Sequence, residues 1–240
     1  MINRFAAIDE IRELLETMHQ LLDPESGCPW DLQQTHKSLK GGLLEETYEA
    51  LEAIDSENRE SMAEEFGDLL IQLVFHGELA DKQGAFSLAD IAKGAKEKLI
   101  RRHPHVFCGN SVSSAEEVKE LWDRVKADER NAKGEKHTSV LEGIPRTMPA
   151  LAFSQAILGR ADREGQRYVP NMELEELIIE WDNTAKDQQG RKEEALGALL
   201  LLLVEQSRKQ GIDAEQALRV TSGKFYEQVV EFSRRNSEKT

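Results

Sequence analysis

Two stretches of the chain, AEEFGDLL at residues 63–70 and EEALGALL at residues 193–200, share the pattern Gly-x-Leu-Leu. The first stretch carries two acids, Glu65 and Asp68, at positions that alanines occupy in the second. Leu, Ala and Glu, which make up most of both stretches, are strong helix formers. The two stretches therefore predict the same helix twice, once with a pair of carboxylates and once without it.

Further matches connect the two halves of the chain. LEE at residues 44–46 aligns with LEE at residues 174–176, at the spacing that also relates the two Gly-x-Leu-Leu stretches. KQG at residues 82–84 reappears at residues 209–211 with a slightly shorter spacing. A tandem duplication is the simplest account of these matches, and two unrelated helix pairs that match by chance are the alternative.

The boundary between the halves is predicted at residues 131–149, where Gly and Pro occur and few apolar residues follow a period. We therefore expect a helical-bundle domain at residues 1–130 and a second one at residues 150–240. A chain of 240 residues is long enough to give each of them a core.

The whole chain is predicted to be all-α. Aromatic residues are only 6% of the sequence, and no segment alternates apolar and polar residues as a half-buried strand would. Ser87 with Asp90, and Ser114 with Glu117, resemble the capping boxes that open helices. The expected helices run to about residue 22 and over about 39–54, 58–82, 87–102, 114–132, 150–164, 172–187, 191–210 and 213–235.

Composition indicates which molecules the protein can bind and in which cellular compartment it is expected. The formal net charge of −14 argues against a nucleic acid polymer as partner. Two cysteines far apart, Cys28 and Cys108, predict free thiols in a reducing compartment. The most apolar run, ALLLLLV at 198–204, is too short to span a bilayer, and the N-terminus has no secretory apolar core. We expect a cytoplasmic protein with no membrane partner.

Two acidic pairs lie on consecutive predicted helices. Glu46 and Glu49 are three residues apart, and so are Glu65 and Asp68, so each pair shares one helix face. Helices joined by a short turn pack antiparallel, which lets four carboxylates converge. Asp and Glu oxygens suit a hard cation, Mg²⁺ or Mn²⁺. A solvated acidic face is the alternative, which a single Glu-x-x-Glu would favour but two neighbouring pairs do not.

Other site chemistries are disfavoured or excluded. A di-iron site takes Glu-x-x-His from each of two helices, and only Glu16 and His19 have that spacing here. The sequence has no phosphate-binding loop of the G-x-x-x-x-G-K-[ST] type, no C-x-x-C zinc pattern and no G-x-S-x-G element.

A basic cluster follows the acids. Lys98, Arg101 and Arg102 lie in the last turns of a predicted helix, where cations complement the helix dipole. The functional interpretation is an anion clamp, because Arg offers a bidentate fork to phosphate oxygens. Trp122 and Lys126 are four residues apart and suit a stacked base and a phosphate, although Trp122 is equally suited to a core position.

Four motifs together resemble the MazG-type nucleoside triphosphate pyrophosphohydrolases: CPWDLQQTH at 28–36, LLEETYEAL at 43–51, EEFGDLL at 64–70 and KLIRRHPHVF at 98–107. The family motif is E-E-x-x-E, a spacer, then E-x-x-D. The resemblance covers nearly the whole chain, because two-domain members also carry a tandem copy. It implies an all-α bundle that assembles as a homodimer or a higher homo-oligomer, with the site between helices and subunits.

The resemblance also implies the reaction and the roles of residues. The reaction is Mg²⁺-dependent hydrolysis of NTPs and dNTPs between the α and β phosphates, which clears nucleotides from the cellular pool. The implied metal ligands are Glu46, Glu49, Glu65 and Asp68. The other implied site residues are Glu45 as a supporting acid, Lys98 and Arg102 as triphosphate contacts beside Arg101, and Trp122 with Lys126 as base or sugar contacts. Ser61 departs from the pattern, because some members have a basic phosphate contact there.

Glu45 or Glu49 is expected to accept a proton from the attacking water, because a general base must be a carboxylate that the metal does not fully engage. Lys98 and Arg102 are expected to neutralise charge on the leaving pyrophosphate. The competing hypothesis is a non-catalytic helical dimer that binds nucleotides or proteins.

The second half lacks most of this set. Ile179 stands where Glu49 would be, and Ala195 and Ala198 replace the acids of the first copy. The surrounding LGALLLLLVE is apolar on every side, which predicts a buried helix. We therefore expect the second copy to be structural and only the first to be catalytic.

Overall fold

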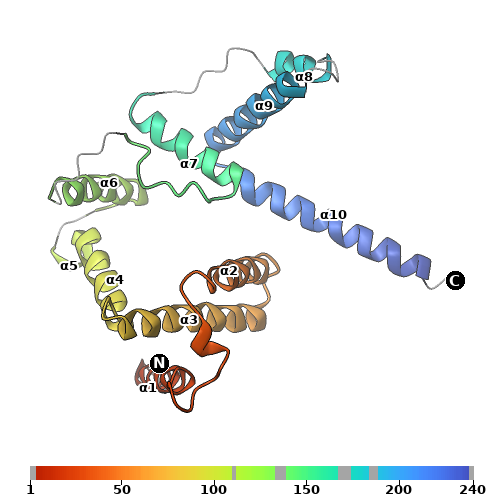
Figure 1. The fold of residues 1–240 in the computed structure, drawn as a ribbon. Helices are drawn as coiled ribbons and strands as arrows, with labels where there is room; N and C mark the ends of the chain where they lie inside the picture. Colours follow the sequence, from red (N-terminus) through yellow and green to blue (C-terminus); the bar gives the residue numbers. More distant parts are fainter. Residues whose placement is uncertain (1–3, 110–111, 133–138, 167–173, 184–188, 238–240) are drawn as a thin grey trace. The chain divides into compact units, whose positions relative to one another are not determined.

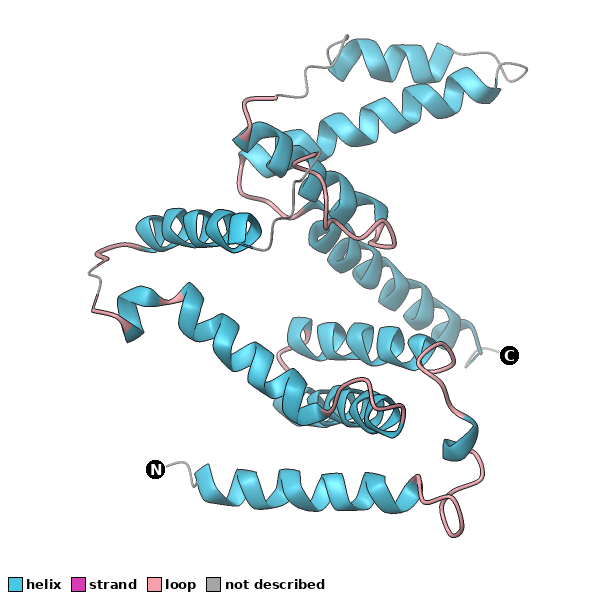
Figure 2. Ribbon diagram, turned by 60° about the vertical axis from the view of Figure 1, so that its left-hand side comes forward, coloured by secondary structure: helices cyan, strands magenta, loops and turns pink. Residues whose placement is uncertain are grey.

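A computed structural model of the chain describes residues 4–109, 112–132, 139–166, 174–183 and 189–237. These residues form helices and connecting turns, with no strand among them, which confirms the predicted all-α class. The chain divides into two compact units, a first unit Met1–Gly134 and a second unit Glu135–Thr240. The division falls inside the range predicted as a linker. Figures 1 and 2 show the helices, and each unit is described by itself.

The described residues of the first unit form six α-helices and a short 3-10 turn at Asp31–Gln33. Most of the helices begin and end within two residues of the expected positions, but the four-residue helix that Pro104 opens was not predicted. Proline is tolerated there because the first helical N–H needs no partner inside the helix. The helices are α1 (Arg4–Leu21), α2 (Lys40–Asp55), α3 (Arg59–Lys82), α4 (Leu88–Arg102), α5 (Pro104–Phe107) and α6 (Ala115–Ala132).

Helices α2 and α3 form a hairpin that carries both acidic motifs. Asn58 caps α3, because its side chain accepts hydrogen bonds from the backbone N–H groups of Glu60 and Ser61. Further along, α3 packs against α1 around a small core of buried side chains. That core consists of Met18, Leu22, Leu39, Val74 and Phe75.

Helix α4 leaves α3 at the C-terminal end of α3 (Figure 1). Gly84, with φ of +65°, ends the turn after α3. Ser87 and Asp90 then form the predicted capping box, with bonds in both directions. The two helices touch at Gly77, where a Cβ atom would lie 3.1 Å from the backbone nitrogen of Leu88. A side chain at this position would force α3 and α4 apart.

The second predicted capping box is only half formed. The backbone N–H of Glu117 donates to the Ser114 hydroxyl at 3.2 Å, as predicted. The Glu117 carboxylate, however, accepts bonds from the N–H and hydroxyl of Ser113, at 2.8 and 2.9 Å. The reciprocal bond of the box therefore goes to the residue before the cap.

The second unit repeats the hairpin. Helices α8 and α9 pack against each other as α2 and α3 do, and Leu177, Leu199 and Leu202 form their core. For the helix predicted at about 172–187, residues 172–173 and 184–187 lie outside the described residues. The helices are α7 (Ala150–Arg163), α8 (Leu174–Asn183), α9 (Gln189–Lys209) and α10 (Ala214–Ser237).

The expectation that α9 is buried on every side is wrong. Leu199, Leu202 and Val204 are buried, but Leu196, Leu200 and Leu203 are 38%, 43% and 43% exposed. A hairpin covers only one stripe of a helix, so an apolar residue on another stripe stays accessible.

Among the described residues, no helix combines the length and the apolar character that a membrane span requires.

The alanines that replace the acids lie on the packed side of α9. Ala195 is 5% exposed, and Ala198 packs against the core of the hairpin. Small apolar side chains at these positions let α8 and α9 approach. The second copy therefore uses for packing the positions that carry carboxylates in the first.

A buried ion pair lies near the C-terminal end of α9, between Glu205 and Arg208. The Glu205 side chain is 4% exposed, and Arg208 donates two hydrogen bonds to it at 2.9 and 3.2 Å. Arg208 also donates to Asp162 of α7 at 3.0 Å. These bonds lower the pKa of Glu205, so the carboxylate stays charged despite its burial. The bond from Arg208 to Asp162 joins α9 to α7.

Candidate metal and nucleotide site

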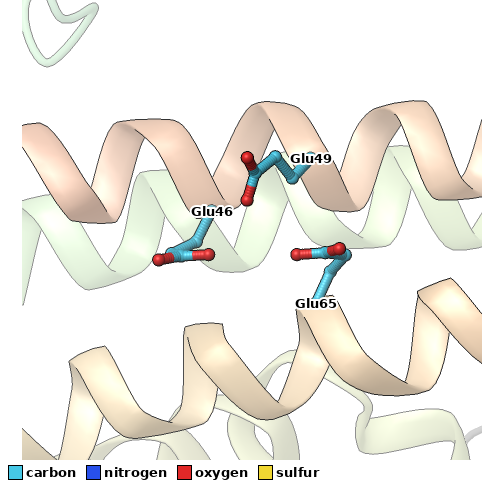
Figure 3. A group of neighbouring side chains, drawn as sticks. All are labelled: Glu46, Glu49 and Glu65. Atoms are coloured by element: carbon cyan, nitrogen blue, oxygen red, sulfur yellow. The ribbon is translucent and has the colours of Figure 1, made fainter.

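Three carboxylates converge between α2 and α3. Glu46 and Glu49 come from α2 and Glu65 from α3, and one oxygen of each lies within 4.8 Å of the others. Figure 3 shows the three side chains directed toward one another. Glu46 and Glu65 are half-buried and Glu49 is exposed, so the cluster is open to solvent on one side.

The carboxylates oppose one another's ionisation. Burial and the neighbouring charges of Asp68 and Glu49 raise the pKa of Glu46. Burial and the charges of Glu49, Glu64 and Asp68 raise the pKa of Glu65. Like charges held close favour proton uptake or a bound cation. The predicted fourth acid, Asp68, lies outside the closest group but acts on two of its members.

The donor set fits a hard divalent cation. All three converging groups are carboxylates, the ligand type that suits Mg²⁺ and Mn²⁺. The pair considered for a di-iron site has other partners. Glu16 lies 4.0 Å from Arg12, and His19 lies 3.4 Å from Glu78. Glu45, predicted as a supporting acid, is exposed on α2 and is not a member of the converging group.

The predicted basic cluster at the end of α4 is held by an acid from α6. Arg101 Nε donates to Glu129 Oε1 at 2.6 Å, and Arg102 donates to both Glu129 oxygens at 3.3 and 2.8 Å. The hydrogen bond from Arg102, followed by that from Arg101, lowers the pKa of Glu129 to about 2. The same pairing raises the pKa of Arg102. Lys98 is exposed on α4.

Trp122 packs beside the basic cluster. Its ring meets the ring of His103 edge to face, with centroids 5.3 Å apart. Trp122 Nε1 and His105 Nδ1 are both buried, and neither has a hydrogen-bond partner among the described residues. Buried polar atoms without partners are uncommon in native proteins. The side chain of Lys126, the predicted neighbour of Trp122, lies outside the described residues.

The acidic and basic groups lie at opposite ends of the α3–α4 pair. Glu65 and Asp68 are in the first half of α3, whereas α4 contacts α3 near Gly77. Arg102 is 14 residues beyond Leu88, about 21 Å along a helix. Figure 1 shows α4 running away from the hairpin. One copy of the chain therefore does not bring the two predicted clusters together.

Two features of the first unit escaped prediction. His36 and His76 face each other with their Nδ1 atoms 2.7 Å apart, and burial lowers the pKa of His76. Glu129 is the second feature. Its spacing of seven residues from Trp122 and three from Lys126 places it on their helix face. That spacing was the sequence signal that could have added Glu129 to the predicted site residues.

Comparisons with known proteins place the chain in a family. The profile of the MazG nucleotide pyrophosphohydrolase domain matches residues 34–107, which include both acidic motifs and the basic end of α4. The chain is 38% identical over 226 residues to a nucleoside triphosphate pyrophosphohydrolase of Escherichia coli (strain K12), covering 91% of this chain and 85% of that protein. It is 42% identical over 223 residues to the nucleoside triphosphate pyrophosphohydrolase/pyrophosphatase MazG of Thermotoga maritima, covering 90% and 82%. A crystal structure of a mazG-related protein from Thermotoga maritima superposes with a TM-score of 0.42 at 26% identity, covering 48% of this chain and 98% of that one.

Proposed function

Because the chain belongs to the MazG family, we propose that it hydrolyses nucleoside and deoxynucleoside triphosphates between the α and β phosphates, with Mg²⁺ or Mn²⁺ as cofactor. The relatives that are 38% and 42% identical to it carry the name nucleoside triphosphate pyrophosphohydrolase. The observation that carries the proposal is the convergence of Glu46, Glu49 and Glu65 within 4.8 Å, inside the family match.

The acids of the α2–α3 hairpin hold the cation in this proposal. Glu46, Glu49 and Glu65 supply the converging oxygens, and Asp68 is the fourth ligand, one turn after Glu65 on α3. When bound, the ion neutralises phosphate charge and polarises a phosphoryl oxygen. The raised pKa values of Glu46 and Glu65 make ion and proton direct competitors for the same oxygens.

Glu49 or Glu45 accepts the proton of the attacking water. Glu49 is the stronger candidate, because it belongs to the carboxylate group and is also exposed to solvent. A general base must lie within hydrogen-bond reach of the water that it activates. Glu45 lies on the same helix four residues before Glu49 and is exposed as well.

The basic end of α4 binds the triphosphate in this proposal. Lys98, Arg101 and Arg102 offset the charge that develops on the leaving pyrophosphate. Trp122 and Lys126, on the facing helix α6, contact the base or sugar. The second unit has no equivalent of the acidic group and contributes structure.

A substrate panel tests the proposed function. The purified chain is incubated with the common NTPs and dNTPs, with Mg²⁺ and with a chelator, and the products are separated by ion-exchange chromatography. We expect nucleoside monophosphate and pyrophosphate in equal amounts, and no turnover with the chelator. Saturable binding of nucleotide without turnover would support the non-catalytic alternative instead, and release of orthophosphate would contradict the assigned bond.

We also propose that the site is completed in a homodimer. The acids and the basic cluster lie apart within one chain, and the acidic hairpin exposes large apolar side chains, Leu44 at 54% and Phe66 at 50%. Exposed apolar groups of this kind mark interaction surfaces when they gather.

Light scattering should give about twice the 27.1 kDa of one chain if the protein is a homodimer. Mixing inactive Glu65→Gln and Arg102→Ala chains should restore part of the activity, and full turnover by a monomer would contradict the proposal.

A further inference from the structure

We propose that Glu129 is a positioning residue, which fixes the guanidinium of Arg102 so that its free edge receives phosphate. The inference rests on the proposed function, because it assigns Arg102 to the triphosphate. Glu129 Oε1 and Oε2 accept bonds from Arg102 Nε and Nη2 at 3.3 and 2.8 Å. A guanidinium has five N–H donors, and this pairing uses two of them. The remaining edge of Arg102 keeps donors for an anion.

The burial of the three groups indicates the side from which the anion approaches. The Glu129 side chain is 14% exposed, Arg102 is 33% exposed and Arg101 is 51% exposed. The carboxylate therefore lies beneath the two guanidinium groups. Two arginines share one carboxylate, so the group keeps a net positive charge even before Lys98 is counted. An anion is still attracted to the exposed side.

Phosphate adds to this pairing and does not replace it. The pKa of Glu129, about 2, means that the carboxylate remains ionised at any physiological pH. Displacing it from both arginines would leave a mostly buried charge without a partner, which is strongly unfavourable. The bound anion thus finds Arg102 already oriented, and less side-chain entropy is lost on binding.

Glu129 also aligns the two helices that carry the predicted substrate contacts. Arg101 and Arg102 end α4, and Glu129 lies on the face of α6 that includes Trp122 two turns earlier. The contact between Trp122 and His103 continues the same packing. One carboxylate therefore sets the register between the phosphate contacts and the base contact.

The test compares Glu129→Gln with Glu129→Asp and with Asp128→Asn in the full chain. Asp128 is exposed on the same helix, so its variant removes the same charge without touching Arg102. Binding of inorganic tripolyphosphate is measured by calorimetry, beside KM and kcat for an NTP and the helix content from circular dichroism. Simple electrostatics predicts that loss of a negative charge strengthens anion binding, whereas positioning predicts the opposite.

We expect Glu129→Gln to weaken tripolyphosphate binding and to raise KM by about tenfold, with kcat little changed and the same effect at pH 6 and pH 8. Glu129→Asp should recover part of the loss, and Asp128→Asn should resemble the wild type. Binding by Glu129→Gln that equals or exceeds wild type overturns the inference, while NTP turnover would leave the proposed function intact. If tripolyphosphate binding depends on Glu129 as expected but the wild type hydrolyses no NTP, the proposed function fails and the inference stands.

Discussion

Substitution of Glu65 by glutamine is expected to reduce Mg²⁺-dependent turnover by at least about a hundredfold, because it replaces one of the carboxylates proposed to hold the cation by a neutral amide. The change keeps the size of the side chain and removes only its charge. Glu64→Gln, on the same turn of α3 but outside the converging group, is the matched control and should keep most of the activity. Initial rates with and without added Mg²⁺ measure both effects.

The same variant separates a lost ligand from a damaged fold. Glu65 is repelled by Glu49 and Asp68, and this repulsion contributes to its raised pKa. Neutralising it should leave the metal-free chain at least as stable as wild type in urea, while calorimetry shows weaker Mn²⁺ binding. Undiminished turnover in both Glu65→Gln and Asp68→Asn would show that the cation site lies elsewhere.

Substitution of Arg208 by alanine is expected to cost the second unit about 3–5 kcal/mol, because it leaves the buried Glu205 carboxylate without its main partner. Lys209 Nζ, 3.4 Å from Glu205, compensates only in part. Amide hydrogen exchange followed by mass spectrometry should show the loss of protection in α7 and α9, with α2 and α3 unchanged. Arg235→Ala, which breaks an exposed pair with Glu231, is the control and should change little.

The sign of the pH dependence follows from the lowered pKa of Glu205. A carboxyl whose pKa falls on folding stabilises the folded state above its ordinary pKa of 4.5, and this contribution is lost as the pH falls below that value. Wild-type protection in α9 should therefore decline on acidification from about pH 5. The double variant Glu205→Leu with Arg208→Met should lose this dependence and keep near-normal stability. Equal stability of Arg208→Ala and wild type at pH 7 would contradict the role of the pair.

The sequence was informative where local chemistry decides the structure. The hairpin of α2 and α3, the capping box at Ser87 and a convergence of acids follow from spacing along the helices and from the short turn between α2 and α3. The hairpin and the box are observed. Three of the four acids predicted to converge, Glu46, Glu49 and Glu65, form one group, and Asp68 lies outside it. The family prediction from four short motifs is confirmed by relatives that cover most of the chain.

Prediction failed where contacts join distant segments. Glu129 is an ordinary surface acid by its sequence, and only the packing of α6 on α4 brings it to Arg102. Glu205 sits in an apolar run yet is buried as an ion pair, because Arg208 of the same helix supplies two bonds. The exposed leucines of α9 were misjudged because composition does not say how many neighbours a helix has.

Because α4 contacts α3 closely at Gly77 and Leu88, a small tilt of α4 at this contact moves its far end by a larger distance, as in a lever. Its fulcrum is Gly77, where a Cβ atom would lie 3.1 Å from the backbone nitrogen of Leu88, and its load is the guanidinium of Arg102, about 21 Å away along the helix. A methyl group at the fulcrum that tilted α4 by about 3° would move that guanidinium by about 1 Å. Displacements of that size are enough to cost two orders of magnitude in a positioned reaction. The absence of a side chain at Gly77 thus fixes the place at which phosphate would meet its cations in the proposed function.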